Sequence, residues 1–222
     1  MDVIEPFVQE LSGYQTVIVA NGAFPQSRLA LHLLQNAEQI IGCDGAIRKF
    51  EKAHITPQVL VGDCDSMDAE SMIHWKDILH IDRSEEYNDL QKALKFCLAQ
   101  HPDPSRPIIL LGCDGLRDDH YIANISIMAC YSTQLPLVMV TQSGIFNIIH
   151  RTATLTSVPG QQISVFSKDE RLRLTFHGLK YPVTQRAFHY LWEGSLNEDL
   201  GEQFTIELER EGLVLVYREV RD

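Results

Sequence analysis

Short apolar runs alternate with amphipathic stretches over the first two thirds of the chain. Runs such as TVIVA, QIIGC, VLVG and PIILLG have the length and bounding residues of buried strands. Between them, stretches such as PQSRLALHLLQ and NDLQKALKFCLAQ repeat their apolar positions with the period of a helix. Strand and helix in alternation imply right-handed crossovers. The pattern therefore predicts an α/β unit with a doubly wound, mostly parallel sheet.

After Gly144 the pattern changes to short segments typical of antiparallel strands. These segments, parted by PG, KDE and EG, are ATLTSV, QISVFS, LRLTFH, FTIELER and LVLVYRE. Such a series predicts a small all-β sandwich or barrel. We therefore expect two domains, an α/β domain over residues 1–143 and a β-rich domain over residues 144–222.

Composition narrows the class of protein. The chain has 222 residues, 45% of them hydrophobic, and a formal net charge of -11. Such an acidic balance argues against binding to nucleic acid, whose phosphates call for a surplus of Lys and Arg. No apolar run approaches the length of a membrane span, and the first residues lack the apolar core of a signal peptide. We expect a cytoplasmic protein with no membrane or nucleic-acid partner.

Cysteine and histidine give no sign of zinc or disulfides. The five cysteines are odd in number and never form C-x-x-C, so we expect reduced thiols packed as small core residues. The nine histidines show no zinc-binding spacing. Any metal should therefore be held by oxygen.

Carboxylates follow the predicted strands. Asp44 comes after QIIGC, and Asp63 and Asp65 come after VLVG in the stretch PQVLVGDCDSMDAE. The carboxyl ends of parallel strands form one rim, where ligands bind. Two carboxylates about 4 Å apart repel by roughly 4 kcal/mol at an effective dielectric near 20, so a chain that gathers them offsets the repulsion with a cation or splays them into water. We assign Asp82 and Asp114, which also follow strands, to ordinary turns.

A carboxylate and an amine extend this set on a predicted helix. Asp89 and Lys92 stand three positions apart after Asn88, a suitable N-cap, and so share one face. Each feature also has a structural explanation: a lone D-x-D is more often a turn, and Lys92 could lie on a solvated face. Their shared position on one rim favours a Mg²⁺-dependent site for a phosphorylated ligand, most simply a nucleotide. The residues alone do not name the reaction.

Six motifs then carry a resemblance to a known family. CDGAIRKF, GDCDS, NDLQKAL, GLRDDHYIANI, PGQQISVFS and GLKYPV follow the order and near spacing of the thiamine pyrophosphokinase family, from about Val17 to Tyr217. The resemblance implies transfer of a pyrophosphoryl group from ATP to the hydroxyl of thiamine, giving thiamine diphosphate and AMP. It also implies a homodimer whose active site lies near the subunit interface.

The resemblance also implies roles for individual residues. Arg117 and Lys92 would neutralise charge on the transferring group, and Asp119 would position or deprotonate the attacking hydroxyl. The proposed Mg²⁺ ligands are Asp63, Asp65 and Asp89. The proposed ATP-binding positions are Asn21, Gly22, Asp44, Gly45, Ser66 and Asn124. The proposed thiamine contacts are Tyr181 and Asn197.

The chain departs from the family pattern at several positions. Ala46 and Arg48 stand where the motif D-G-G-A-N has its second glycine and its asparagine, and Glu86 stands where the family has aspartate. Leu196 replaces a serine beside Asn197. The ATP and metal end of the site therefore carries over better than the thiamine end.

Two other classes of protein remain open at this point. Phosphatases of the haloacid dehalogenase type also use D-x-D after a strand, but they have Thr or Val where this chain has Met67, and they place the motif on the first strand. A nucleotide-binding or metal-binding module without turnover would tolerate the substitutions at Ala46, Arg48 and Leu196.

Overall fold

The protein divides into two compact units, which we describe separately. The computed structural model describes residues 4–65 and 67–220. One unit comprises Gly13–Gln142, and the other comprises Met1–Ser12 together with Ser143–Asp222.

The first unit alternates strands and helices as the periodicity predicts. Its strands are β1 (Thr16–Val19), β2 (Gln39–Cys43), β3 (Val59–Gly62), β4 (Leu79–Ile81), β5 (Ile108–Leu111) and β6 (Leu137–Val140). Its helices are α2 (Arg28–Gln35), the short 3₁₀ turn η1 (Asp44–Ala46), α3 (Ile47–Ala53), α4 (Ala69–Trp75), α5 (Asp89–Ala99) and α6 (Asp118–Tyr131). Capping residues start several of them: Ser27, Asp68 and Asn88 each accept a backbone N–H of the first turn.

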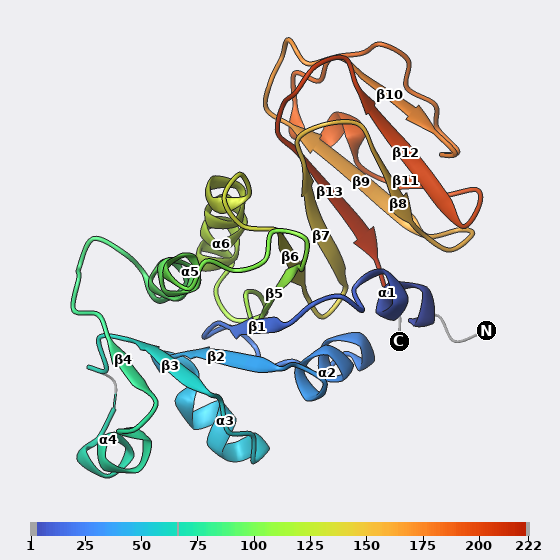
Figure 1. Ribbon diagram of the computed structural model, residues 1–222. Helices are drawn as coiled ribbons and strands as arrows, with labels where there is room; N and C mark the ends of the chain where they lie inside the picture. The colour runs from blue at the N-terminus through green and yellow to red at the C-terminus, as the bar shows by residue number, and fades with distance from the viewer. Residues whose placement is uncertain (1–3, 66, 221–222) are drawn as a thin grey trace. The chain divides into compact units, whose positions relative to one another are not determined.

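The strands of this unit pair in parallel in the order β6-β5-β1-β2-β3-β4. The chain first moves from β1 outward to β4, then returns past β1 to β5 and β6. Right-handed crossovers therefore put α2, α3 and α4 on one face of the sheet and α5 and α6 on the other, as Figure 1 shows. The order reverses between β1 and β5. This reversal is the topological switch point at which open parallel sheets bind ligands.

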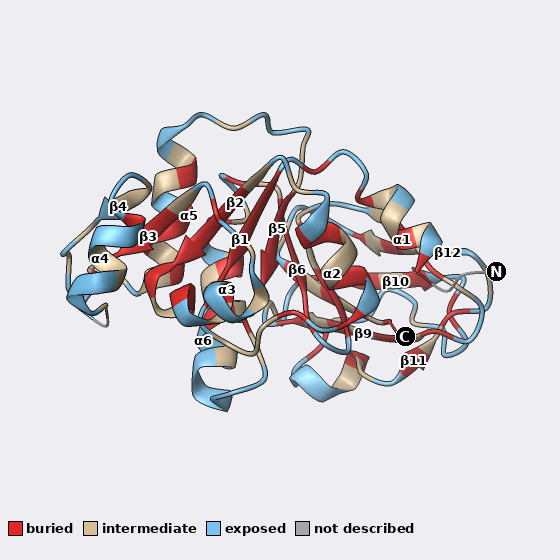
Figure 2. Cartoon of the chain, turned by 90° about the horizontal axis from the view of Figure 1, so that it is seen from below, coloured by how far each residue is buried: buried red, intermediate tan, exposed pale blue. Residues whose placement is uncertain are grey.

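Burial on both faces explains the composition of the central strands. Every residue of β1, β5 and β6 is buried, and these strands are red in Figure 2. Strands covered on both sides by helices read as continuous apolar runs, which is the pattern of TVIV and IILL. The outer strand β4 (LHI) has no fully buried residue.

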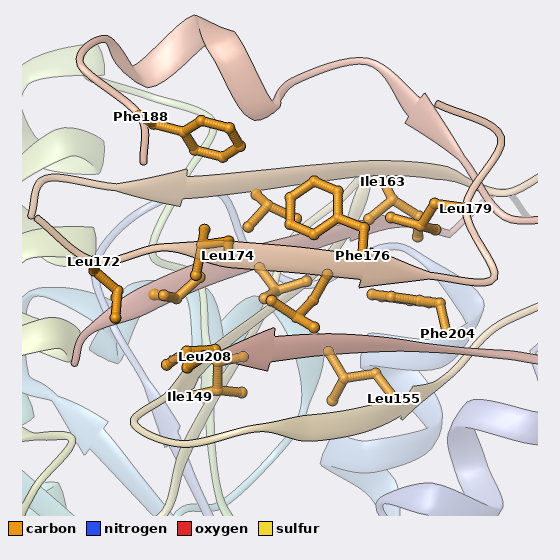
Figure 3. Packing of buried hydrophobic residues seen from close by; sticks show 14 residues of the cluster. Ile149, Leu155, Ile163, Leu172, Leu174, Phe176, Leu179, Phe188, Phe204 and Leu208 are labelled. Carbon is orange, nitrogen blue, oxygen red and sulfur yellow. The ribbon is translucent and has the colours of Figure 1, made fainter. Parts of the chain in front are cut away.

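The second unit is an antiparallel sandwich, as the sequence predicts. One sheet has the order β11-β9-β13-β7 and the other β10-β12-β8. The strands are β7 (Gly144–Ile149), β8 (Ala153–Thr156), β9 (Gln162–Ser167), β10 (Leu174–His177), β11 (Asn197–Glu198), β12 (Gln203–Leu208) and β13 (Val214–Glu219), and a 3₁₀ turn, η2 (Leu191–Gly194), precedes β11. Alternate residues of β9, β12 and β13 are buried. Their side chains meet those of the facing sheet in one core, which Figure 3 shows around Phe176, Phe188 and Phe204.

The N-terminal helix was not anticipated, and it belongs to the β-rich unit. Helix α1 (Glu5–Glu10) contacts β8. Arg218 of β13 is fully buried; its guanidinium donates to both carboxylate oxygens of Glu10 at 2.6 and 3.0 Å, to the carbonyl of Thr156 and to Asn147 Oδ1. The ring of Phe7 lies 5.6 Å from the guanidinium carbon. Helix α1 lies within the expected domain of residues 1–143 but groups with the other unit, where its Glu10 forms a buried ion pair.

The other expectations concern thiols and membrane helices. Four cysteines are free and buried, as expected, whereas Cys130 is free and exposed on α6. Within residues 4–65 and 67–220, no helix combines the length and the apolar character needed to cross a bilayer.

The ion pair between Glu10 and Arg218 predicts a large effect of a small change. Glu10→Ala leaves a fully buried guanidinium without its counter-charge, so the free energy of unfolding should fall by about 3 kcal/mol or more. Urea unfolding followed by circular dichroism measures the loss. Glu5→Ala is the matched control on the same helix: its exposed carboxylate accepts from the Gln9 amide at 3.3 Å, and its removal should cost less than about 1 kcal/mol. Equal losses in the two variants would contradict the assigned role of the pair.

Candidate active site

A cavity opens at the switch point of the parallel sheet. Its volume is about 620 Å³, a size that suits a nucleotide or a similar small molecule. The lining comes from the carboxyl ends of β1, β2 and β5, from α3, and from the N-terminal parts of α5 and α6. It consists of Ala20, Asn21, Gly22, Cys43, Lys49, Asn88, Asp89, Leu90, Cys113, Asp114, Leu116, Arg117, His120, Ala123 and Asn124.

One wall is made by two strand-end loops in direct contact. Beyond β1 and β5 the backbones stay paired: Gly22 N–H donates to the carbonyl of Gly112 and Ala23 N–H to that of Asp114, both at 2.6 Å. A Cβ on Gly22 would lie 2.3 Å from Gly112 O and 2.4 Å from Asp114 O. Only glycine fits between these backbones, so Gly22 determines how close the two loops can come.

A second contact joins the β1 loop to the start of α3. A Cβ on Gly45 would lie 2.2 Å from Asn21 Nδ2, so the side chain of Asn21 rests on the glycine. Lys49, one turn into α3, donates to the carbonyl and the side-chain oxygen of Asn21 at 2.7 Å each and to the carbonyl of Gly22 at 2.6 Å. Three of the expected nucleotide positions, Asn21, Gly22 and Gly45, are thus adjacent.

Asp44 links the ends of β2 and β3. Its side chain is 3% exposed, and its Oδ2 accepts the backbone N–H of Cys64 at 2.6 Å. A Cβ on Gly62 would meet the Asp44 carboxyl carbon at 2.3 Å, so the glycine that ends β3 makes room for the carboxylate. Asp44 is expected at the nucleotide site; the structure places it beneath the site, among buried groups.

Three carboxylates gather around one ammonium group. Lys92 is 2% exposed; its Nζ lies 2.8 Å from Asp63 Oδ2 and 3.8 Å from Asp89 Oδ1. Burial, reinforced by the Asp44 carboxylate, raises the pKa of Asp89 to about 6. The hydrogen bond from Lys92 lowers the pKa of Asp63. The cluster of Asp44, Asp63 and Asp89 therefore holds more negative charge than the single lysine balances.

The expected metal ligands are close in the fold but do not form a ready-made metal site. Asp65 is exposed, and its backbone N–H donates to Asp63 Oδ1 at 3.3 Å. Within the described ranges, no three His, Cys, Asp or Glu side chains converge as metal ligands. The donor chemistry still fits Mg²⁺, since the groups are carboxylates with excess charge. Magnesium is usually held by one or two carboxylates, with water and substrate phosphates completing the octahedron.

The loop before α6 supplies an exposed ion pair at the cavity. Arg117 Nε donates to Asp119 Oδ1 at 3.0 Å and Arg117 Nη2 to Asp119 Oδ2 at 2.6 Å. The guanidinium lowers the pKa of Asp119 to about 2. Arg117 lines the cavity together with His120, whereas Asp119 is not among the lining residues. Such a carboxylate accepts hydrogen bonds at neutral pH but is a poor proton acceptor.

Of the two remaining expected ATP positions, one can be described. Asn124 on α6 lines the cavity, is buried, and donates from Nδ2 to the carbonyl of Cys113 at 2.9 Å. It therefore ties α6 to the end of β5. Ser66 lies outside the described residues.

The two expected thiamine contacts are neighbours in the β-rich unit. Asn197 is buried, and its amide holds the backbone of Tyr181: it accepts from Tyr181 N–H at 3.0 Å and donates to the Tyr181 carbonyl at 2.8 Å, while its oxygen also accepts the N–H of Glu198 at 2.9 Å. The ring of Tyr181 is exposed. Asn197 is thus placed to hold the backbone that carries Tyr181, and Tyr181 alone of the two presents its side chain.

Comparison with known proteins identifies the family. Residues 30–139 match the sequence model of the thiamin pyrophosphokinase catalytic domain, and residues 144–217 match that of the thiamin pyrophosphokinase substrate-binding domain. The chain belongs to the thiamin pyrophosphokinase family. The family and enzyme class expected from the six motifs are thereby confirmed, and neither the phosphatase nor the non-catalytic module gains support.

Solved structures show that the fold is that of thiamin pyrophosphokinases. The structure resembles the enzyme from Candida albicans (TM-score 0.81, 15% identity, 96% of this chain and 91% of that chain). It also resembles the enzymes from Bacillus subtilis (0.75, 19%, 94% and 100%) and yeast (0.76, 14%, 99% and 90%). No curated protein sequence gave a significant match.

The departures from the thiamin pyrophosphokinase pattern have different structural consequences. Ala46 has φ -86°, so the backbone there does not require the family's second glycine. Arg48 is exposed on α3. Leu196 is 76% exposed with φ +60°, a left-handed conformation that is unfavourable for a leucine. The strain lies beside Asn197, at the position where the family has serine.

The assignment of Asp114 to an ordinary turn was incomplete, because Asp114 lines the cavity. Lys49 and His120, which also line it, were not singled out from the sequence. Lys49 is a single lysine on a short helix, and nothing in its spacing distinguishes it from Lys52. His120 stands in the quoted motif GLRDDH, and the motif's position at the start of a helix could have indicated it. Neither had a partner that sequence reasoning could name.

Gly22 gives a direct test of the cavity wall. Gly22→Ala would press a methyl group against two carbonyl oxygens, so the free energy of unfolding should fall by about 1–3 kcal/mol. The affinity for nucleotide should fall with it. Thermal unfolding and nucleotide titration measure the two effects. Gly13→Ala is the control in the same unit, because a Cβ there meets nothing within 4 Å. The proposed steric role fails if Gly22→Ala behaves like Gly13→Ala.

Proposed function

We propose that the protein transfers the pyrophosphoryl group of ATP to the hydroxyl of thiamine, giving thiamine diphosphate and AMP. The observation that carries the proposal is a cavity with charged groups at the switch point of a chain whose two parts match both thiamin pyrophosphokinase domains. In this reaction the thiamine oxygen forms a bond to the β-phosphorus. The bond between that phosphorus and the oxygen bridging to the α-phosphate breaks, and the hydroxyl proton is released.

The cavity suits a nucleotide for two reasons. Its wall includes strand-end backbone that approaches closely because Gly22 and Gly45 have no side chains. Its rim carries cationic groups, Arg117 and Lys49, near the carboxylate of Asp89. A polyphosphate chain needs cations directly or through a metal, and this arrangement supplies both kinds of group.

The carboxylate cluster supports a magnesium site. Asp63 and Asp89 are the better candidates for ligands, because both lie beside Lys92 in an environment with surplus negative charge. Asp65 is exposed and could contribute through water. Mg²⁺ held there would supply positive charge that offsets the charge of the ATP phosphates.

The side chains then divide the remaining work. Arg117 offers a planar guanidinium that can exchange its Asp119 partner for phosphate oxygens. Lys92 is buried against Asp63 and Asp89, so its charge acts on the phosphates mainly through that cluster. Asp119, with its low pKa, suits orientation of the attacking hydroxyl better than removal of its proton. The catalysis would rest on positioning and electrostatic stabilisation.

Tyr181 and Asn197 of the β-rich unit are the proposed thiamine contacts. Thiamine carries a permanent thiazolium charge and a flat pyrimidine, both of which suit an aromatic face. Tyr181 offers such a face, and Asn197 holds its backbone. Homodimer formation, with the active site near the subunit interface, stays a prediction from the family.

The first experiment is a product assay. Purified protein with ATP, thiamine and Mg²⁺ should form thiamine diphosphate and AMP in equal amounts, and chelation of Mg²⁺ should stop both. Chromatography of both products measures the reaction. Release of inorganic phosphate without AMP would instead indicate a phosphatase, and nucleotide binding without either product would indicate a non-catalytic module.

A second experiment tests the metal ligands without turnover. Asp63→Asn should weaken binding of Mg²⁺ together with α,β-methylene-ATP by about tenfold or more, because it removes a charged oxygen ligand. Calorimetry at constant nucleotide measures the affinity. Asp77→Asn, an equal change of charge at an exposed position in the same unit, is the control. Unchanged metal affinity in Asp63→Asn would remove Asp63 from the site.

A further inference from the structure

Lys49 occupies an unusual position for a lysine at the edge of a cavity. Its ammonium has three N–H donors, and each has one short contact: Asn21 O, Asn21 Oδ1 and Gly22 O, at 2.7, 2.7 and 2.6 Å. In the described part of the chain its ammonium meets no carboxylate. Burial lowers the pKa of Lys49. A half-buried cation thus rests on neutral oxygens of one loop, and that loop lines the cavity.

These contacts determine which way the amide of Asn21 faces. Lysine can only donate, so the side-chain atom of Asn21 that meets Nζ must be the oxygen. The nitrogen, Nδ2, then lies against Gly45, and Asn21 itself lines the cavity. None of the hydrogen bonds within residues 4–65 and 67–220 uses Asn21 Nδ2 as donor. Lys49 also draws two backbone carbonyls toward itself, which lowers their repulsion of an anionic ligand.

We propose that Lys49 is a positioning residue for the nucleotide: it fixes the Asn21–Gly22 loop so that Asn21 Nδ2 donates to an acceptor atom of the bound nucleotide. The inference rests on the proposed function only in taking the ligand to be ATP. The acceptor is either a phosphate oxygen or a ring nitrogen of the base, and both have the same lone-pair chemistry. Lys49 acts through Asn21 and is not itself a catalytic residue.

The test compares four variants of the full chain in binding of α,β-methylene-ATP with Mg²⁺. Lys49→Met keeps the length of the side chain but removes all three donors, so binding should weaken by about tenfold or more. Lys49→Arg retains charge and donors and should recover most of the affinity. Asn21→Ala removes the group that Lys49 positions. Lys52→Met, on the exposed side of the same helix, is the matched control and should bind like the unmodified protein.

The energetic coupling between Lys49 and Asn21 shows whether Lys49 acts through Asn21. If Lys49 acts through Asn21, the two substitutions remove the same interaction. The double variant of Lys49→Met and Asn21→Ala should then bind α,β-methylene-ATP as tightly as the single variant with the lower affinity. Additive losses, or binding by Lys49→Met within about twofold of the unmodified protein, would overturn the proposal. Should Lys49→Met fail to fold, Lys49→Gln, which retains a donor amide, takes its place in the same cycle.

Two ligand fragments locate the acceptor. If Lys49→Met weakens the binding of inorganic triphosphate, the acceptor is a phosphate oxygen. If it weakens the binding of adenosine and leaves that of triphosphate unchanged, the acceptor is on the base. Unchanged binding of both fragments and of the whole nucleotide contradicts the proposal. In an active enzyme the Michaelis constant for ATP should rise while that for thiamine stays the same. Binding is measured without turnover, so the two proposals can fail separately. A protein that binds the nucleotide but makes no thiamine diphosphate would refute the proposed reaction. The binding data would still test the role of Lys49.

Discussion

The buried carboxylate of Asp44 organises the charged end of the α/β unit. It is nearly inaccessible, it accepts the backbone N–H of Cys64, and Gly62 gives it room. By holding the ends of β2 and β3 together it brings the D-x-D loop beside α5, where Lys92 meets Asp63 and Asp89. The field of this carboxylate also helps to keep the pKa of Asp89 high. A group beneath the site thus determines the charge that the site presents to a ligand.

Glycines bring the backbone segments around the site into close contact. Gly22 lets the loops after β1 and β5 touch, and Gly45 lets Asn21 rest on the start of η1. Without these close backbone contacts, the switch point of the sheet would be an open edge. With them it becomes a cavity whose walls are backbone on one side and charged side chains on the other. Sheet topology selects the location, and residues without side chains determine how closely a ligand is surrounded.

The sequence predicted the architecture well because burial leaves a clear pattern. TVIV and IILL are apolar throughout because helices cover both faces, and QISVFS alternates because only one face meets the core. Helix α1 escaped prediction because its attachment to the β-rich unit depends on one arginine more than two hundred positions away. For the site, periodicity placed Asp63 and Asp89 on one rim, and the resemblance to the family added Arg117. Neither could show that Lys92 is buried beside acidic side chains or that Asn197 holds the backbone of Tyr181, because both facts depend on side-chain contacts between separate segments.

The partnership of Glu10 and Arg218 has a consequence for how the chain folds during synthesis. The two residues are separated by 208 positions, so the first helix emerges from the ribosome long before the strand that receives it. The α/β unit, Gly13–Gln142, is complete in sequence by the time β7 is made. The β-rich unit must wait until β13 has been made, and until then its opening segment lacks the partner of Glu10. A nascent chain that stops short of Arg218 would hold a complete parallel sheet and an incomplete sandwich.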